Sequence, residues 1–90
     1  MARVIQLRGT ASTREVWLDG KYLSPAKSQK VRNHSPDGFA WGYSGSGPAQ
    51  LALAVILEVY PNDWQRHDYQ AFKERHIAPL PVGGDFNVII

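Results

Sequence analysis

Residues 38–54 read GFAWGYSGSGPAQLALA, a glycine- and aromatic-rich segment that continues into a strongly apolar one. Proline is favoured at the first position of a helix, so Ser46-Gly47-Pro48 marks a helix start. Nearly every residue from there to about Tyr60 is apolar, apart from Gln50 and Glu58. A helix that is apolar all round is buried on all sides, so this segment predicts the central helix of the fold.

Short apolar segments separated by turn residues flank this helix. Residues 4–7, 15–18 and 21–23 are typical of strands, and Asp19-Gly20 is a tight-hairpin signal. Residues 39–41 indicate a further short strand, residues 63–76 a second helix and residues 86–90 a last strand. Apart from the short strand over residues 39–41, which leads to the glycine loop, the order is βββ-αα-β. This order predicts a single α+β domain over residues 1–90, with a small antiparallel sheet packed by two helices.

Composition narrows the class of protein further. The 90 residues include no cysteine, which excludes disulfides and thiolate metal sites, and 43% are hydrophobic, as in ordinary globular proteins. The net charge of +2 and the lack of a basic run make nucleic acid an unlikely partner. The longest apolar run, residues 51–57, is too short to span a membrane, and the N-terminus lacks the apolar core of a signal peptide. We expect a soluble cytoplasmic protein.

The apolar helix also bears on assembly. A chain of 90 residues is only marginally able to bury a core, and this one has no disulfide to compensate. One sheet face and one neighbouring helix can hardly cover a helix that is apolar all round. We therefore expect a homo-oligomer.

Two interpretations of the glycine loop stay open. In the first, the free N–H groups at the helix start, from Gly45 to Ala49, take a phosphate, and Phe39, Trp41 or Tyr43 stacks on a base. In the second, the loop is a tight turn into the helix and its aromatics lie in the core. Either Ser46 caps the helix, or Gly47 does so with Gln50 at the third helical position.

Several cations accompany the loop. Arg66 follows the central helix, Arg14 lies on a predicted strand, and Arg32 and His34 lie just before the loop. Arginine binds phosphate in a bidentate manner, although a solvated surface charge is the simpler explanation for each of these side chains taken singly. On the first interpretation the ligand-binding residues are Phe39, Trp41, Tyr43, Gly45, Ser46, Gly47, Gln50, Arg66, Arg14, Arg32 and His34.

The sequence offers little for catalysis. The three histidines, His34, His67 and His76, do not have metal-ligand spacing, so we expect no metal site and no cofactor. Gly45-Ser46-Gly47 comes close to a nucleophile elbow, but no acid and base accompany it, so we expect no catalytic residues. The glycine spacing also departs from that of dinucleotide-binding folds.

The loop motif, preceded by Asn33-His34-Ser35-Pro36 and followed by Tyr69-Gln70-x-Phe72-Lys73, resembles a family of small phage and bacterial domains. The likeness covers about residues 14–90, and that family has no assigned activity. At the level of class, the chain is also similar to phage anti-defence sponges. These are small oligomers that sequester cyclic nucleotide immune signals, such as those of Thoeris immunity.

These resemblances imply a phage-type protein that binds a small phosphate-bearing nucleotide, withholds it from a host effector and is not an enzyme. Two other functions stay open. The aromatic-glycine loop could inhibit a host defence enzyme by direct protein contact, because Trp, Tyr and Arg anchor such interfaces. The chain could also be a small nucleotide hydrolase.

Overall fold

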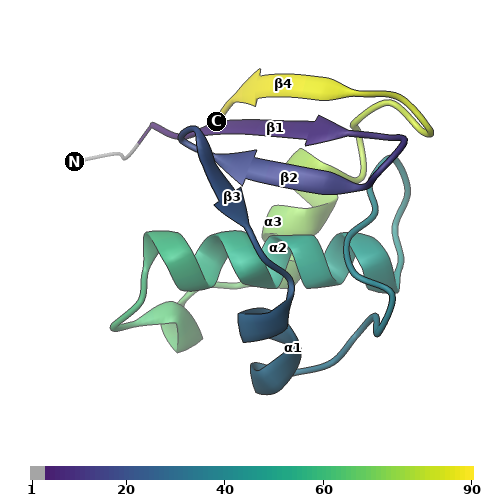
Figure 1. The fold of residues 1–90 in the computed structure, drawn as a ribbon. Coiled ribbons are helices and arrows are strands. Elements are labelled where there is room, and N and C mark those ends of the chain that lie inside the picture. The colour runs from purple at the N-terminus through teal and green to yellow at the C-terminus, as the bar shows by residue number, and fades with distance from the viewer. Residues whose placement is uncertain (1–3) are drawn as a thin grey trace.

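A four-stranded antiparallel sheet lies across helix α2, and short helical segments pack around the rest of that helix (Figure 1). The computed structural model describes residues 4–90. The strands lie in the order β3-β2-β1-β4, and the predicted α+β class with an antiparallel sheet is confirmed. The elements are β1 (Gln6–Thr10), β2 (Glu15–Leu18), β3 (Lys21–Leu23), α1 (Ala26–Val31), α2 (Ser46–Val59), the 3₁₀ turn η1 (Trp64–Arg66), α3 (Tyr69–Phe72), the π-helical turn η2 (Lys73–Ile77) and β4 (Phe86–Ile89).

The sheet has one apolar face, which packs on α2. Leu7 of β1 and Val16 of β2 are fully buried there, whereas their neighbours along each strand are at least partly exposed. The predicted hairpin is confirmed, because Asp19 and Gly20 have φ values of 51° and 81°. Two positive φ values in a two-residue loop match the right-handed twist of the strands it joins.

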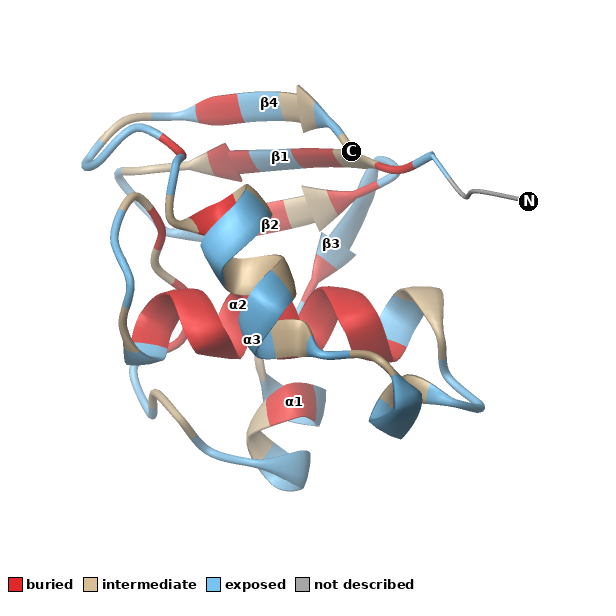
Figure 2. Cartoon of the chain, turned by 180° about the vertical axis from the view of Figure 1, so that it is seen from behind, coloured by how far each residue is buried: buried red, intermediate tan, exposed pale blue. Residues whose placement is uncertain are grey.

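Helix α2 is buried along almost its whole length, from Gly47 to Leu57 (Figure 2). The sheet covers one side of it, and α1, α3, η1 and η2 from the same chain contact the others. The assumption that the chain is too small to enclose this helix is therefore wrong. The homo-oligomer inferred from that assumption stays a prediction that α2 does not support. No helix within residues 4–90 is both long and apolar enough to cross a membrane.

The predicted second helix over residues 63–76 is interrupted. Asp68 has extended backbone, with φ −83° and ψ 91°, and its carboxylate accepts the N–H of Ala71 at 3.0 Å. This capping bond starts a new helix, α3, so η1 and α3 are separate. The ring of His67 stacks on that of Tyr60, with centroids 3.6 Å apart, which holds the break against the end of α2.

Two further differences concern the segments before α2. Residues 39–41 form no strand, because Ala40 packs against Gly47 at the start of α2 instead of joining the sheet. Helix α1 was not predicted at all. Its signal is Ser24-Pro25, where the Ser24 hydroxyl accepts the Ala26 N–H at 3.2 Å, since serine followed by proline is typical of a helix start.

Candidate functional site

A surface pocket of about 670 Å³ opens at the end of the sheet where β1 finishes and β2 and β4 begin. We call it the Tyr43 pocket. Three segments that are far apart in sequence meet there. Its lining residues are Ala11, Ser12, Arg14, Ala40, Trp41, Tyr43, Val82, Gly83 and Asp85.

Strand pairing brings two of the three segments together. Because β1 is antiparallel to both neighbours, Thr10 lies opposite Glu15 and Gly9 lies opposite Phe86. The β1–β2 turn and the residues before β4 therefore share one end of the sheet. The carboxylate of Asp85 joins them, since it accepts the N–H of Ala11 at 2.7 Å.

Gly42 fixes residues 40–43 against residues 82–85. Its N–H donates to the carbonyl of Ile77 at 3.1 Å, and its φ is +87°, a value that favours glycine. A Cβ at this position would lie 2.7 Å from the Cα of Val82, so only glycine permits such a close approach. The pocket wall formed by residues 40–43 and 82–83 thus depends on this one glycine.

Trp41 and Tyr43 have different roles in the pocket. Trp41 is only 5% exposed, its indole N–H donates to the carbonyl of Gly84 at 2.8 Å, and its ring packs edge-on against Phe86. Trp41 therefore forms a fixed wall. Tyr43 is 50% exposed and its ring lies over Gly45, where a Cβ would come within 2.7 Å of it. Tyr43 can offer an aromatic face to a ligand.

Arg14 supplies the positive charge of the pocket. It lies in the β1–β2 turn with φ +60°, a left-handed conformation that costs an L-residue about 1–2 kcal/mol. The backbone N–H of Arg14 donates to the carbonyl of Thr10 at 2.7 Å, and this bond closes the turn. Its exposed guanidinium makes no ion pair or hydrogen bond within residues 4–90. A strained backbone that presents an exposed arginine beside a pocket is a candidate functional feature.

Gln50 has a structural role instead of the predicted ligand contact. Its side chain is fully buried in α2 and uses both ends of its amide. The oxygen accepts the N–H groups of His34 and Ser35, at 2.7 and 2.9 Å, and the nitrogen donates to the Ser28 hydroxyl and the Arg32 carbonyl, at 2.9 and 3.1 Å. Gln50 thus ties the α1–α2 connection to the core and has no capacity left for a ligand.

Arg32 and His34 belong to this Gln50 cluster and do not line the Tyr43 pocket. The ring of His34 lies 2.7 Å from the hydroxyl of Tyr69. Burial, followed by the charges of Arg32 and Lys73, lowers the pKa of His34. A neutral imidazole adds no charge for a phosphate, so the predicted role of His34 as a phosphate partner has no support here.

The start of α2 is a poor phosphate cradle. Gly47 is buried against Ala40, with an ideal Cβ only 2.6 Å from the alanine Cβ, and the N–H of Ala49 already donates to Gly45 at 3.0 Å. The Ser44 hydroxyl donates to the carboxylate of Glu74, at 2.5 Å, and thereby holds a negative charge beside the loop. This hydrogen bond is the main cause of the lowered pKa of Glu74. Ser46, although exposed, does not line the Tyr43 pocket.

Two more predicted ligand residues lie elsewhere. Phe39 is only 3% exposed and belongs to the core, so neither of its ring faces is free to stack. Arg66 lies in η1, beyond the C-terminal end of α2, whereas the glycine loop lies at the N-terminal end. A helix of 14 residues separates the two ends by about 21 Å. Arg66 therefore lies at the opposite end of α2 from the glycine loop.

Sequence reasoning missed the other six residues that line the Tyr43 pocket, which are Ala11, Ser12, Ala40, Val82, Gly83 and Asp85. The signal that could have found them is the strand order, because an antiparallel β2-β1-β4 arrangement places the turn after β1 beside the residues before β4. Within residues 4–90, no group of three His, Asp or Glu side chains lies together in a way that could hold a metal ion.

Comparison with known proteins identifies a family for the chain. Residues 6–88 match a family of unknown function (DUF6166), and the chain therefore belongs to that family. No curated protein and no solved structure matches the chain.

Proposed function

We propose that this member of the DUF6166 family is a binding protein that holds a small phosphate-bearing nucleotide in the Tyr43 pocket. The observation that carries the proposal is that Arg14, which has no partner within residues 4–90, and the half-exposed ring of Tyr43 line the same pocket. Its volume of about 670 Å³ lies within the usual range for small-molecule sites, about 300–1,000 Å³.

The residues around the pocket suit the parts of a nucleotide. The base stacks on the exposed face of Tyr43, with Trp41 as the fixed wall beside it. The phosphate pairs with the guanidinium of Arg14, whose planar fork matches phosphate oxygens. Within residues 4–90, the Ser12 hydroxyl and the second carboxylate oxygen of Asp85 make no hydrogen bond, so both can bond to ribose hydroxyls.

The proposed biological role is sequestration of a cyclic nucleotide immune signal in the host cytoplasm, as the class-level resemblance to anti-defence sponges implies. A sponge releases its nucleotide unchanged when the protein is denatured by heat, whereas a hydrolase releases cleaved product. Mass spectrometry of the released nucleotide distinguishes these two functions.

Direct inhibition of a host enzyme through the aromatic-glycine loop has less support. Phe39 and Trp41 are buried, so of the three loop aromatics only Tyr43 has substantial exposed surface. A protein interface of ordinary strength is anchored by several such residues together.

We predict that Arg14→Gln weakens nucleotide binding at least tenfold, because a charge-assisted hydrogen bond to phosphate contributes about 1.5–3 kcal/mol. Isothermal titration calorimetry is carried out with ADP, cyclic ADP-ribose and cyclic di-AMP. The dissociation constant of the nucleotide that binds the wild type most tightly is then compared between the wild type and the variant. Arg66→Gln is the matched control, because it removes an exposed arginine at the far end of α2, and we expect its affinity to stay within about twofold of the wild type. Equal losses in the two variants would contradict the assignment of Arg14.

A further inference from the structure

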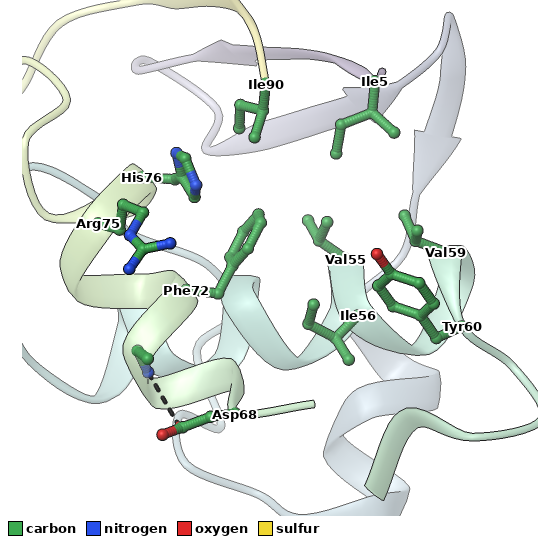
Figure 3. A pocket seen from close by; sticks show the side chains of 11 residues that line it. Ile5, Val55, Ile56, Val59, Tyr60, Asp68, Phe72, Arg75, His76 and Ile90 are labelled. Carbon is green, nitrogen blue, oxygen red and sulfur yellow. Dashed lines mark hydrogen bonds between the residues drawn. The ribbon is translucent and has the colours of Figure 1, made fainter. Parts of the chain in front are cut away.

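A second cavity, of about 500 Å³, lies between α2, the α3–η2 segment and the ends of the sheet strands (Figure 3). We call it the Phe72 groove. Val55 and Val59 of α2, Ile5 and Ile90 at the sheet, and the ring of Phe72 form its apolar floor. It shares no lining residue with the Tyr43 pocket.

The floor of the groove is held in place by backbone bonds. Ile5 and Ile90 exchange both of their N–H···O bonds, at 3.0 and 2.9 Å, so the sheet side is fixed. On the helical side, the N–H of Ala78 donates to the carbonyl of Lys73 at 2.8 Å, which closes the π-helical turn η2. π-Helical turns are rare in proteins, and those that occur are often found at functional sites.

The positive charge at the polar end of the groove comes from Arg75. Arg75 and His76 stand on η2 at the same end, as Figure 3 shows. Arg75 is exposed and makes no ion pair or hydrogen bond within residues 4–90. Asp68 is a second charged group of the lining, and one of its carboxylate oxygens accepts the N–H of Ala71. Burial, followed by the charge of Arg75, lowers the pKa of His76. The imidazole is therefore neutral at pH 7, and Arg75 is the positive group at this end.

We propose that the Phe72 groove binds a small apolar carboxylic acid, whose chain or ring lies on the apolar floor and whose carboxylate pairs with Arg75. A guanidinium matches a carboxylate in a bidentate manner. No second lysine or arginine of the described chain lines the groove, which disfavours a doubly charged phosphate. The concave groove is also far smaller than a stable protein interface, which takes roughly 20–30 residues from each partner, so a second copy of the chain fits it poorly.

The test uses the whole chain and three probes in calorimetry: decanoate below its micelle-forming concentration, decan-1-ol and acetate. Decanoate should bind more tightly than decan-1-ol, and acetate should show no binding. Arg75→Gln should weaken decanoate binding about tenfold and leave decan-1-ol binding unchanged, because only the acid uses the charge. Arg66→Gln, which removes an exposed arginine outside the groove, should bind all three probes as the wild type does.

Three outcomes would overturn the proposal. Decanoate could fail to bind, decanoate could bind equally well to the wild type and Arg75→Gln, or decan-1-ol could bind as tightly as decanoate. Self-association of the wild type that Arg75→Gln abolishes, without decanoate binding, would assign the groove to a second copy of the chain. Nucleotide binding at the Tyr43 pocket is measured with different probes, so either proposal can fail without the other.

Discussion

Gln50→Leu should lower the free energy of unfolding by about 3 kcal/mol, one of the two largest effects that we expect from a single substitution in this chain. The side chain is fully buried and makes four hydrogen bonds, two as acceptor and two as donor. Leucine has nearly the same volume but offers none of them. The N–H of Ser35 then loses its partner, whereas the N–H of His34 keeps its bond to the Arg32 carbonyl and the Ser28 hydroxyl keeps its bond to the Pro25 carbonyl. Four lost hydrogen bonds at about 0.5–1.5 kcal/mol each, with one donor left unsatisfied at about 1–3 kcal/mol, account for the expected loss.

Urea denaturation followed by circular dichroism measures this loss. Gln70→Leu is the matched control, because Gln70 is exposed on α3, and it should change stability by no more than about 0.5 kcal/mol. A loss below about 1 kcal/mol for Gln50→Leu would contradict the structural role of the Gln50 cluster. It would also reopen the interpretation of Gln50 as a ligand contact.

Gly42→Ala should lower the free energy of unfolding by about 3 kcal/mol or more, for two additive reasons. An L-residue at φ +87° costs about 1–2 kcal/mol, and the new Cβ would lie 2.7–2.8 Å from the Cα and backbone nitrogen of Val82. Because the clash is with backbone, no rotation of a side chain relieves it, and forced backbone shifts typically cost a further 1–3 kcal/mol.

Gly20→Ala separates the cost of the positive φ from the cost of the steric clash. Gly20 has φ +81° and no atom within 4 Å of an ideal Cβ, so it carries the conformational cost without the clash. We expect a loss of about 1 kcal/mol at Gly20, and the difference between the two variants measures the close approach of residues 42 and 82. Equal losses would contradict that close approach and, with it, the observed shape of the Tyr43 pocket.

The parts of the fold that the sequence predicted are those with local signals. Asp19-Gly20 specifies a two-residue hairpin by its φ requirements alone, and the apolar run after Pro48 specifies a buried helix. The break at Asp68 depends on one capping bond and on the stacking of His67 over Tyr60. A helical spacing of apolar residues continues across that break, so the pattern alone predicts one uninterrupted helix.

The candidate site was less predictable, because it depends on tertiary contacts. The loop contributes Trp41 and Tyr43 to the Tyr43 pocket, but its partners come from residues 11–14 and 82–85. The choice of Arg14 over Arg66 rests on strand pairing and on the length of α2, which no local pattern contains. The buried positions of Phe39 and Trp41 agree with the open alternative in which the loop is a turn with aromatics in the core.

The central claim is that a phosphate-bearing nucleotide binds in the Tyr43 pocket, and amide chemical shifts test it residue by residue. The measurement is a ¹⁵N–¹H correlation spectrum of the wild-type chain, titrated separately with ADP, cyclic ADP-ribose and cyclic di-AMP. We predict that at least one of these nucleotides shifts the amide resonances of Arg14, Tyr43 and Gly83 together, in a saturable manner. If all three nucleotides leave these resonances unmoved, or if the shifts are confined to the start of α2, no nucleotide binds in the Tyr43 pocket.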